Sequence, residues 1–233
     1  MAKPKIALDG LSLQNPKEFN MIVKQLIVGF FQVGCYIAGC EKTHQCVLID
    51  PAGDEERIMA TVNDLGLEVV ATINTHGHPD HTCGNRKIAA LTGAKTLMHR
   101  LDDEYFSSPA GEAMARQFGI EPSPPADRHI QDGERIEIGD TSLTVIHTPG
   151  HSPGGVCLYG ENNLFTGDTL FVGAVGRTDF AGGSLDTLLE SIKTKILTLP
   201  DDTIIWPGHD YGVSPTSTVG NERKTNPYLA GLS

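Results

Sequence analysis

The sequence predicts an α/β protein built as a four-layer αββα sandwich, in which two facing sheets lie between outer helices. Two observations lead to this prediction. A hairpin of strand-like segments ends at Asp50, and a second hairpin much later in the chain ends at Asp168, so each half supplies strands that finish at one rim. Segments with apolar residues at helical spacing accompany the strands in both halves.

The chain has the size and composition of one domain. It contains 233 residues, of which 39% are hydrophobic and 20% charged, enough for an ample core. Residues 1–20 mix Pro, Lys, Asn and Asp with few apolar anchors, and we interpret them as an N-terminal arm. The arm is either an added oligomer contact or a segment ahead of a more usual start at Met21. Residues 21–233 are predicted to form a single domain.

The first half alternates strand and helix patterns. Its expected elements are strands over 21–28, 33–38 and 45–50, a helix over 54–65, a strand over 69–75, a helix over 85–91 and a strand over 95–98. The polar segment 41–44 indicates a hairpin turn between the second and third strands. Gly93 is expected to end the second helix.

Residues 101–129 differ in composition from the rest of the chain. Acidic, serine and proline residues surround a short helical pattern over 112–118, which predicts an irregular insertion with a helix inside. Such a segment either walls a pocket or packs on the surface. The later expected elements are strands over 134–138, 141–147, 154–159 and 163–166, a helix capped by Ser184, and a strand over 203–206.

Ligand-type side chains crowd together directly after the strand over 69–75. The segment reads His76-Gly77-His78-Pro79-Asp80-His81, and its Gly and Pro predict a loop at the rim of the sheet. Imidazole and carboxylate are ligands that zinc, iron and manganese share. His76 and His78 alternate and can face one point, whereas Asp80 and His81 can face a second. A lone histidine is usually a packed residue, but four such side chains at one strand end favour a metal site.

The spacing of this segment resembles the HxHxDH motif of the metallo-β-lactamase-fold hydrolases. That family carries three later ligands, and the sequence contains a match to each in the right order. They are His151 in a His-Thr-Pro-Gly-His segment, Asp168 in Phe-Thr-Gly-Asp and His209 in Pro-Gly-His. The resemblance covers roughly residues 21–230 and implies the metallo-β-lactamase fold.

The resemblance also implies a binuclear metallohydrolase. The implied ligands are His76, His78 and His151 for one ion, Asp80, His81 and His209 for the other, and Asp168 as a bridge. Two divalent ions about 3.5–4 Å apart can share a water and lower its pKa to about 7, which gives a metal-bound hydroxide as nucleophile. The expected cofactors are two divalent metal ions, with zinc first and iron or manganese as alternatives. Asp80 and Asp168 are the expected catalytic residues.

Residues near these motifs receive plainer interpretations. Asp50 is expected to hold the metal loop in place or to cap a turn. Cys83 is interpreted as a buried filler rather than a ligand. His147 is expected to orient its loop, and His99 to be no ligand, because the family pattern does not need it.

Finer resemblance indicates a substrate class. Segments 173–180 and 220–227 are similar to those of compact glyoxalase II-type proteins, which hydrolyse hydroxyacylglutathione thioesters such as S-lactoylglutathione. The expected partner is therefore a small-molecule thioester, and Arg223 and Lys224 are candidates for binding a glutathione carboxylate. Arg177 and Asp179 are expected to pair with each other. The long helical C-terminal domain of the larger glyoxalase II proteins is missing from this sequence, so another thiol carrier stays open.

A second reaction class also stays open. Segment 173–180 is also similar to persulfide dioxygenases of the same fold, which act on glutathione persulfide and hold one iron. The residues matching that iron site are His76, His151 and Asp168. Pro79 favours the hydrolase, because alanine is common at this position in the dioxygenases.

Other members of the fold match less well. A β-lactamase is disfavoured because the N-terminus lacks an export signal, and a nuclease because the chain is acidic. A flavodiiron-type reductase would carry glutamate where His78 stands. A metal-free interaction module is disfavoured because every ligand position is filled.

Charge and cysteine content set expectations for partners and compartment. The net charge of −11 argues against nucleic acid as a partner. No apolar run approaches about eighteen residues, so neither a membrane span nor a membrane partner is expected. The five cysteines are odd in number and contain no CxxC, which predicts reduced thiols in a cytoplasmic protein. A homo-oligomer is left open.

Overall fold

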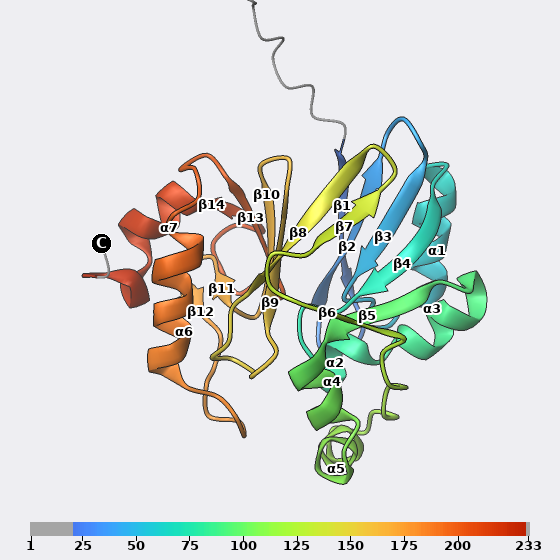
Figure 1. Cartoon of the computed structure of the whole chain (residues 1–233), viewed down its shortest axis with the longest axis horizontal. Coiled ribbons are helices and arrows are strands. Elements are labelled where there is room, and N and C mark those ends of the chain that lie inside the picture. The colour runs from blue at the N-terminus through green and yellow to red at the C-terminus, as the bar shows by residue number, and fades with distance from the viewer. Residues whose placement is uncertain (1–20, 232–233) are drawn as a thin grey trace, which may run out of the picture.

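Two six-stranded sheets face each other in the computed structural model, which describes residues 21–231. Helices cover both outer faces (Figure 1). They are α1 (Glu55–Asp64) and α3 (Asn85–Thr92) on one side, and α6 (Leu185–Ser191) and α7 (Val219–Thr225) on the other. The predicted αββα sandwich is therefore confirmed. The proposed arm, residues 1–20, lies outside the described residues, so the domain boundary stays a prediction.

The first sheet contains the strands of the N-terminal half in sequence order. They are β1 (Met21–Val28), β2 (Val33–Cys40), β3 (Gln45–Ile49), β4 (Glu68–Ile73), β5 (Lys95–His99) and β6 (Arg128–Ile130). The first three pair antiparallel, and β3 to β6 pair parallel. Because parallel neighbours point the same way, the ends of β3 and β4 meet at one rim, where Asp50 and the histidine segment follow.

The second sheet contains the strands of the C-terminal half. In spatial order they are β14 (Ser217–Thr218), β13 (Ile204–Pro207), β10 (Asn163–Gly167), β9 (Val156–Gly160), β8 (Thr141–His147) and β7 (Arg135–Ile138). β10 and β13 are parallel, so the residues after them emerge side by side. A small separate hairpin, β11 (Leu170–Phe171) and β12 (Ala174–Val175), follows β10.

The main apolar core fills the space between the sheets. Val47 and Ile49 of the first sheet and Leu143, Leu158 and Phe165 of the second are fully buried in it. A further apolar cluster lies between each sheet and its outer helices, one cluster per sheet. Dense packing on both faces of each sheet leaves little freedom for the strands, so their ends form a fixed frame for the loops at the rim.

Residues 101–129 require a correction, because they are more regular than the sequence predicted. They form most of α4 (Arg100–Phe106), then α5 (Pro109–Gln117), and they lead into β6. The His99 ring accepts a hydrogen bond from the amide of Leu101 and so caps α4. Ser108 caps α5 in the same way, with Pro109 at its first position. A helix of two turns is too short to show a periodic apolar pattern, which is why α4 escaped prediction.

Smaller differences concern element ends. The second half of the metal segment is a short helix, α2 (Pro79–Thr82), rather than plain loop. Ser184 caps α6 as predicted, but the last turns become a π-helix, η1 (Ile192–Ile196). A 3₁₀ turn, η2 (Pro227–Leu229), follows α7. Gly93 ends α3 with a φ of 71°, a left-handed conformation that glycine adopts without strain.

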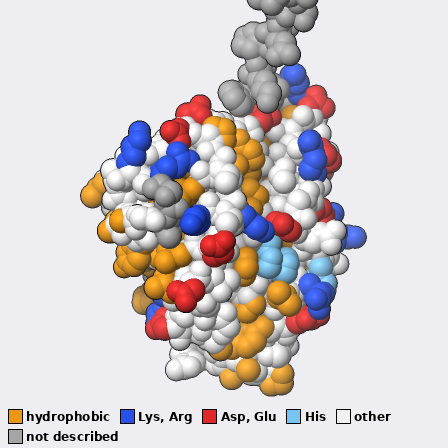
Figure 2. All heavy atoms as spheres, turned by 60° about the vertical axis from the view of Figure 1, so that its left-hand side comes forward, with side chains coloured by type: hydrophobic (Ala, Val, Ile, Leu, Met, Phe, Trp, Pro, Cys, Tyr) orange, Lys and Arg blue, Asp and Glu red, His pale blue; other side chains and the backbone are white. Residues whose placement is uncertain are grey.

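The surface carries mixed charges. On the face shown in Figure 2, Lys and Arg side chains stand apart from one another among acidic and apolar ones. No helix within residues 21–231 is both long enough and apolar enough to cross a membrane.

Candidate metal centre

All seven ligands predicted from the sequence lie at strand ends on one rim of the sandwich. They are His76 and His78 after β4, Asp80 and His81 in α2, His151 after β8, Asp168 after β10, and His209 after β13. The first sheet thus supplies four of them and the second sheet three. The structure brings these segments together in two sets.

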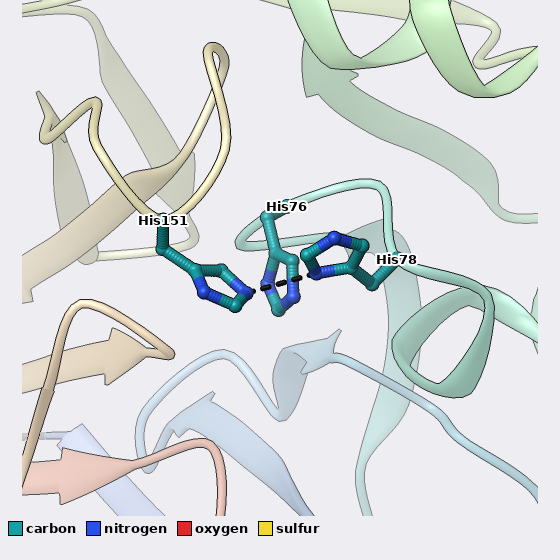
Figure 3. Close-up of side chains that lie close together, drawn as sticks. All are labelled: His76, His78 and His151. Atoms are coloured by element: carbon teal, nitrogen blue, oxygen red, sulfur yellow. Dashed lines mark hydrogen bonds between the residues drawn. The ribbon is translucent and has the colours of Figure 1, made fainter. Parts of the chain in front are cut away.

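The three-histidine set consists of His76, His78 and His151. Their ligand-type nitrogens all lie within 4.8 Å of one another, and all three side chains are buried. His151 Nε2 and His78 Nδ1 are 2.8 Å apart. Figure 3 shows these two rings pointing toward each other from opposite sides, with the His76 ring between them. Three imidazoles from two loops therefore converge on one point.

The carboxylate set consists of Asp80, His81 and His209, whose ligand atoms also lie within 4.8 Å of one another. His81 Nε2 is 3.3 Å from His209 Nε2. Asp80 Oδ2 is 3.8 Å from His81 Nε2 and 3.6 Å from His209 Nε2. The two histidines are buried, whereas the Asp80 side chain is 26% exposed. This set therefore contains the ligand that solvent reaches most easily.

Asp168 lies between the two sets. Its Oδ1 is 3.4 Å from His81 Nε2, and its Oδ2 is 3.6 Å from His151 Nε2 and 3.7 Å from His209 Nε2. One carboxylate thus approaches a nitrogen of each set. This is the position that a bridging ligand needs.

Hydrogen bonds on the far side of the rings fix which nitrogen faces the cluster. His151 Nδ1 donates to the carbonyl oxygen of Arg177 at 2.7 Å. His81 Nδ1 donates to Asp50 Oδ2 at 3.0 Å. In both residues the Nε2 atom is left to face the other ligands. Such partners orient metal-binding histidines and raise the basicity of the ligating nitrogen.

Asp50 supports the histidine segment, as the sequence predicted. Besides His81, its carboxylate accepts hydrogen bonds from the amide and the hydroxyl of Thr75, at 2.8 and 2.6 Å. Asp50 could itself join His76 and His81 in a group of ligand atoms. Because its oxygens already serve Thr75 and the His81 ring, we assign it to support rather than ligation.

The two sets differ in electrostatics. Burial, reinforced by the neighbouring histidines, holds the pKa of His76 well below its usual value and lowers that of His78 to about 3. Burial also opposes charge on His81, but Asp168 and Asp80 outweigh it and raise the pKa of His81 to about 10. Burial would raise the pKa of Asp80, yet the nearby histidines hold it well below its usual range. His76 and His78 are thus neutral, whereas the second set pairs a carboxylate with a protonated ring.

The residues fit divalent metal ions. His76 Nε2 and Asp168 Oδ1 are buried and have no hydrogen-bond partner within the described residues. A buried polar atom left unpaired costs about 1–3 kcal/mol, so a cation that these atoms could bind would relieve that cost. Imidazole and carboxylate together are the donors that zinc, iron and manganese accept.

The cluster lies at the floor of a pocket of about 250 Å³. Five ligands line it: His78, Asp80, His151, Asp168 and His209. The other lining residues are Phe31, Pro79, Phe118, Arg177, Phe180 and Tyr211. Four of these six are aromatic, and they come from four separate segments of the chain. A substrate that enters would therefore meet largely apolar walls above a polar floor.

Arg223 and Lys224, the residues predicted to bind substrate, are not among the described residues that line this pocket. Both lie in α7 on the outer side of the second sheet (Figure 1). The Arg223 guanidinium pairs with Asp201 and also donates to the carbonyl oxygen of Leu197. Lys224 is exposed. The geometry does not support their assignment to substrate, which stays a prediction.

Arg177 does line the pocket. It forms the predicted pair with Asp179, through two hydrogen bonds of 2.7 Å each. Its guanidinium carbon also lies 4.1 Å from the centre of the Phe180 ring. These contacts brace the loop whose backbone carbonyl holds His151.

The plainer interpretations of nearby residues agree with the structure. His147 Nε2 lies 2.9 Å from the carbonyl oxygen of Pro153 and so ties down the His151 loop. His99 caps α4 and stacks on His147. Cys83 is half-buried rather than buried, packs against an apolar cluster, and belongs to none of the ligand groups found among residues 21–231.

Sequence reasoning missed one buried carboxylate and the aromatic walls. Asp102 is fully buried and hydrogen-bonds to both loops of the three-histidine set. Phe31 and Phe118 come from segments far from any motif, so the sequence around them does not predict that they line the pocket. The only sequence signal near Asp102 was its neighbour Asp103, which forms an acidic pair that is equally typical of a solvated turn.

Comparison with known proteins agrees with the fold. The family model of the metallo-beta-lactamase superfamily matches residues 28–209. A Haemophilus influenzae protein named hydroxyacylglutathione hydrolase GloC is 33% identical over 221 residues, covering 91% of this chain and 100% of that protein. The bovine mitochondrial persulfide dioxygenase ETHE1 is 36% identical over 229 residues, covering 97% of this chain and 82% of that protein.

Solved structures with similar folds include two at 34% identity. A B3 metallo-beta-lactamase, BLEG-1, superposes with a TM-score of 0.82 and covers 90% of this chain and 100% of that one. TTHA1623, solved in a di-iron-bound form, gives a TM-score of 0.78 and covers 89% and 100%. With the family match spanning most of the described residues and the ligand motifs gathered at one rim, this chain belongs to the metallo-beta-lactamase superfamily.

Proposed function

We propose that this chain is a metal-dependent hydrolase that cleaves a small-molecule thioester of the hydroxyacylglutathione type. The similarity to GloC supports the substrate class. The apolar pocket walls suit a molecule that buries carbon-rich groups above a polar floor. Action on a small molecule in the cytoplasm, without nucleic acid or membrane as partner, belongs to the same proposal.

One observation carries the hydrolase proposal: both ligand sets are complete, and Asp168 lies between them. Its oxygens are within 3.4–3.7 Å of His81, His151 and His209. A second set of buried or half-buried ligand-type side chains beside the first is what a second ion would need. The arrangement therefore favours two divalent ions, with zinc first and iron or manganese as alternatives.

The residues would divide the work as follows. When bound, the ions would supply a water of lowered pKa and a Lewis acid for the carbonyl oxygen. Asp80, which lines the pocket with a side chain 26% exposed, would help to hold an ion and could orient that water by accepting a hydrogen bond from it. The pKa of Asp80 is held low by its histidine neighbours, so the group accepts rather than donates at neutral pH. Phe31, Phe118 and Phe180 exclude bulk water from the acyl group.

The test is a thioester hydrolysis assay on protein purified without chelators and without added metal. S-lactoylglutathione is the first substrate, and release of free thiol is followed with a thiol reagent. We expect hydrolysis that disappears on metal removal and returns on reloading with two equivalents of zinc, iron or manganese. Absence of hydrolysis over a panel of acyl and carrier groups, with both equivalents bound, would contradict the proposal.

A second candidate is a persulfide dioxygenase with one iron. It is favoured by the similarity to ETHE1 and by the approach of His151 to both His76 and Asp168, three residues of the types that form a two-histidine, one-carboxylate iron site. Such a site leaves positions open for oxygen and substrate. One equivalent of iron with no uptake of a second metal, together with oxygen consumption on glutathione persulfide, would select this candidate over the hydrolase.

A further inference from the structure

Asp102 is a buried carboxylate to which the proposed chemistry gives no part. It is the third residue of α4, and its side chain has no exposed surface. Oδ2 accepts hydrogen bonds from the amide of Gly77 at 2.8 Å and from the hydroxyl of Ser152 at 2.7 Å. Oδ1 accepts one from the amide of Gly154. All three partners are donors, so the site calls for a group that only accepts.

These donors belong to the two loops that carry the three-histidine set. Gly77 lies between His76 and His78 in the loop of the first sheet. Ser152 and Gly154 directly follow His151 in the loop of the second sheet. One carboxylate therefore bridges the loops that must approach each other for the three imidazoles to converge. None of its three hydrogen bonds reaches the carboxylate set.

The packing of α4 against both loops is close. A methyl group added at Gly154 would come within 2.7 Å of Asp102 Oδ1. One added at Gly77 would come within 2.2 Å of the Phe106 ring, in the same helix. Phe106 in turn contacts the His78 ring, with ring centres 5.1 Å apart. The helix thus sets the position of both loops, and glycine at these two points allows the approach.

Burying a carboxylate is unfavourable, because its charged form loses contact with water. Burial raises the pKa of Asp102, because taking the charged form out of water is unfavourable. A separate backbone hydrogen bond, from Val156 to the carbonyl oxygen of Thr75 at 2.8 Å, already joins the two sheets near this point. Asp102 is therefore not needed to hold the sandwich together, and its effect should be confined to the rim.

We infer that Asp102 is a positioning residue that sets the spacing of the His76–His78 loop and the His151 loop, and thereby the metal affinity of the three-histidine set alone. The inference rests on the proposed metal-dependent function. Loss of partners that orient ligands typically costs about 10–100-fold in metal affinity. The carboxylate set, which Asp50 supports, should be unaffected.

The experiment measures zinc affinity of the full chain by competition with a chromogenic chelator. Asp102→Asn keeps the shape but replaces one acceptor oxygen with an amide that donates. It is placed in two backgrounds: His209→Ala, which leaves the three-histidine set intact, and His151→Ala, which leaves the carboxylate set intact. We expect a loss of about 10–100-fold in the first background and less than about threefold in the second.

Two further variants keep the result interpretable. Asp103→Asn removes the neighbouring carboxylate, which contacts His129 and the amide of Ala126 instead of the two loops, and should leave both affinities within about threefold. Ser152→Ala removes one donor to Asp102 and should lower the affinity of the same set by a smaller factor. It provides the measurement if Asp102→Asn fails to fold.

The outcomes separate the inference from the proposed function. Equal losses in the two backgrounds, or no loss in either while zinc is bound, would overturn the role of Asp102 and leave the hydrolase proposal standing. If the unmodified chain bound no zinc, iron or manganese at all, the proposed function would fail, and the inference would fail with it.

Discussion

The two ligand sets at the rim differ in their side chains and in the pKa values of those side chains. The three-histidine set contains two neutral imidazoles, His76 and His78, whose pKa values are held low first by burial. The carboxylate set contains Asp80 and a histidine whose pKa is raised to about 10 by the acidic groups around it. Asp102 bridges the two loops of the first set, whereas Asp50 bonds the His81 ring of the second set and also Thr75, the residue before His76.

This difference teaches that two neighbouring sites can be tuned separately although they share Asp168. In the first set, His76 and His78 are neutral, and the supporting carboxylate bonds two backbone amides and a hydroxyl of the loops rather than a ligand ring. In the second, Asp50 bonds the His81 ring directly, and binding a cation must displace a proton. We expect the two sites to respond differently to mutation and pH, and the following experiments test that comparison.

The largest effect should come from the residue that the two sets share. Asp168→Ala removes the only described carboxylate whose oxygens lie within 3.7 Å of nitrogens in both sets. We expect metal content to fall at both sites and activity to fall by on the order of a thousandfold or more, since ions contribute several kcal/mol and about 4 kcal/mol is about a thousandfold. Elemental analysis and thiol release measure the two losses. Full activity in this variant would defeat the assignment of the whole centre.

Removing one ligand from each set in turn should show how the two sets differ in their effect on metal content and activity. His209→Ala is expected to lower metal content from two equivalents to one and to reduce hydrolysis by about a hundredfold or more, because two-ion chemistry is lost. His151→Ala should also leave one equivalent, held by the carboxylate set. For a single-iron dioxygenase, only His151→Ala should abolish activity. Metal counting beside both assays therefore distinguishes the two candidate functions.

The metal affinities should also depend differently on pH. Between pH 6 and 8 the His81 ring is protonated in the metal-free protein, because its pKa is raised to about 10. Binding at the carboxylate set must release that proton, so its apparent affinity should fall about tenfold for each unit that the pH drops. His76 and His78 are already neutral in this range and release none.

Chelator competition across this pH range measures the contrast, with His209→Ala and His151→Ala isolating the two sets. A steeper slope for the three-histidine set would contradict the electrostatic difference between them. Equal slopes would contradict it as well, because the two sets would then release the same number of protons on binding metal.

The sequence allowed prediction of those parts of the centre whose chemistry is local. His76 to His81 stand within six positions, and the strand before them is visibly apolar, so both the ligands and their place at a sheet rim could be predicted. The facing sheets and the helix capped by Ser184 followed from periodicity and capping residues in the same way.

What escaped prediction depends on contacts between distant segments. Asp102 meets Gly77 and Ser152 from 25 and 50 residues away, and no spacing in the sequence marks that meeting. The reverse holds for Arg223, for which its charge and the resemblance of segment 220–227 to compact glyoxalase II-type proteins suggested a substrate contact. Only the folded structure reveals that Asp201 and the Leu197 carbonyl already occupy its guanidinium.

The smallest expected effect follows from that last point. Arg223→Ala should change KM and kcat for the thioester by less than about twofold, because Arg223 is not among the described residues that line the pocket and its helix, α7, lies on the outer side of the second sheet (Figure 1). Its ion pair with Asp201 is partly exposed, and pairs of this kind contribute about 0–1 kcal/mol, so the melting temperature should drop by no more than about 4 °C. Arg177→Ala is the matched comparison, since Arg177 does line the pocket and should raise KM more. If Arg223→Ala instead raised KM tenfold while Arg177→Ala did not, substrate would have to extend over α7, and the pocket described above would be only part of the binding site.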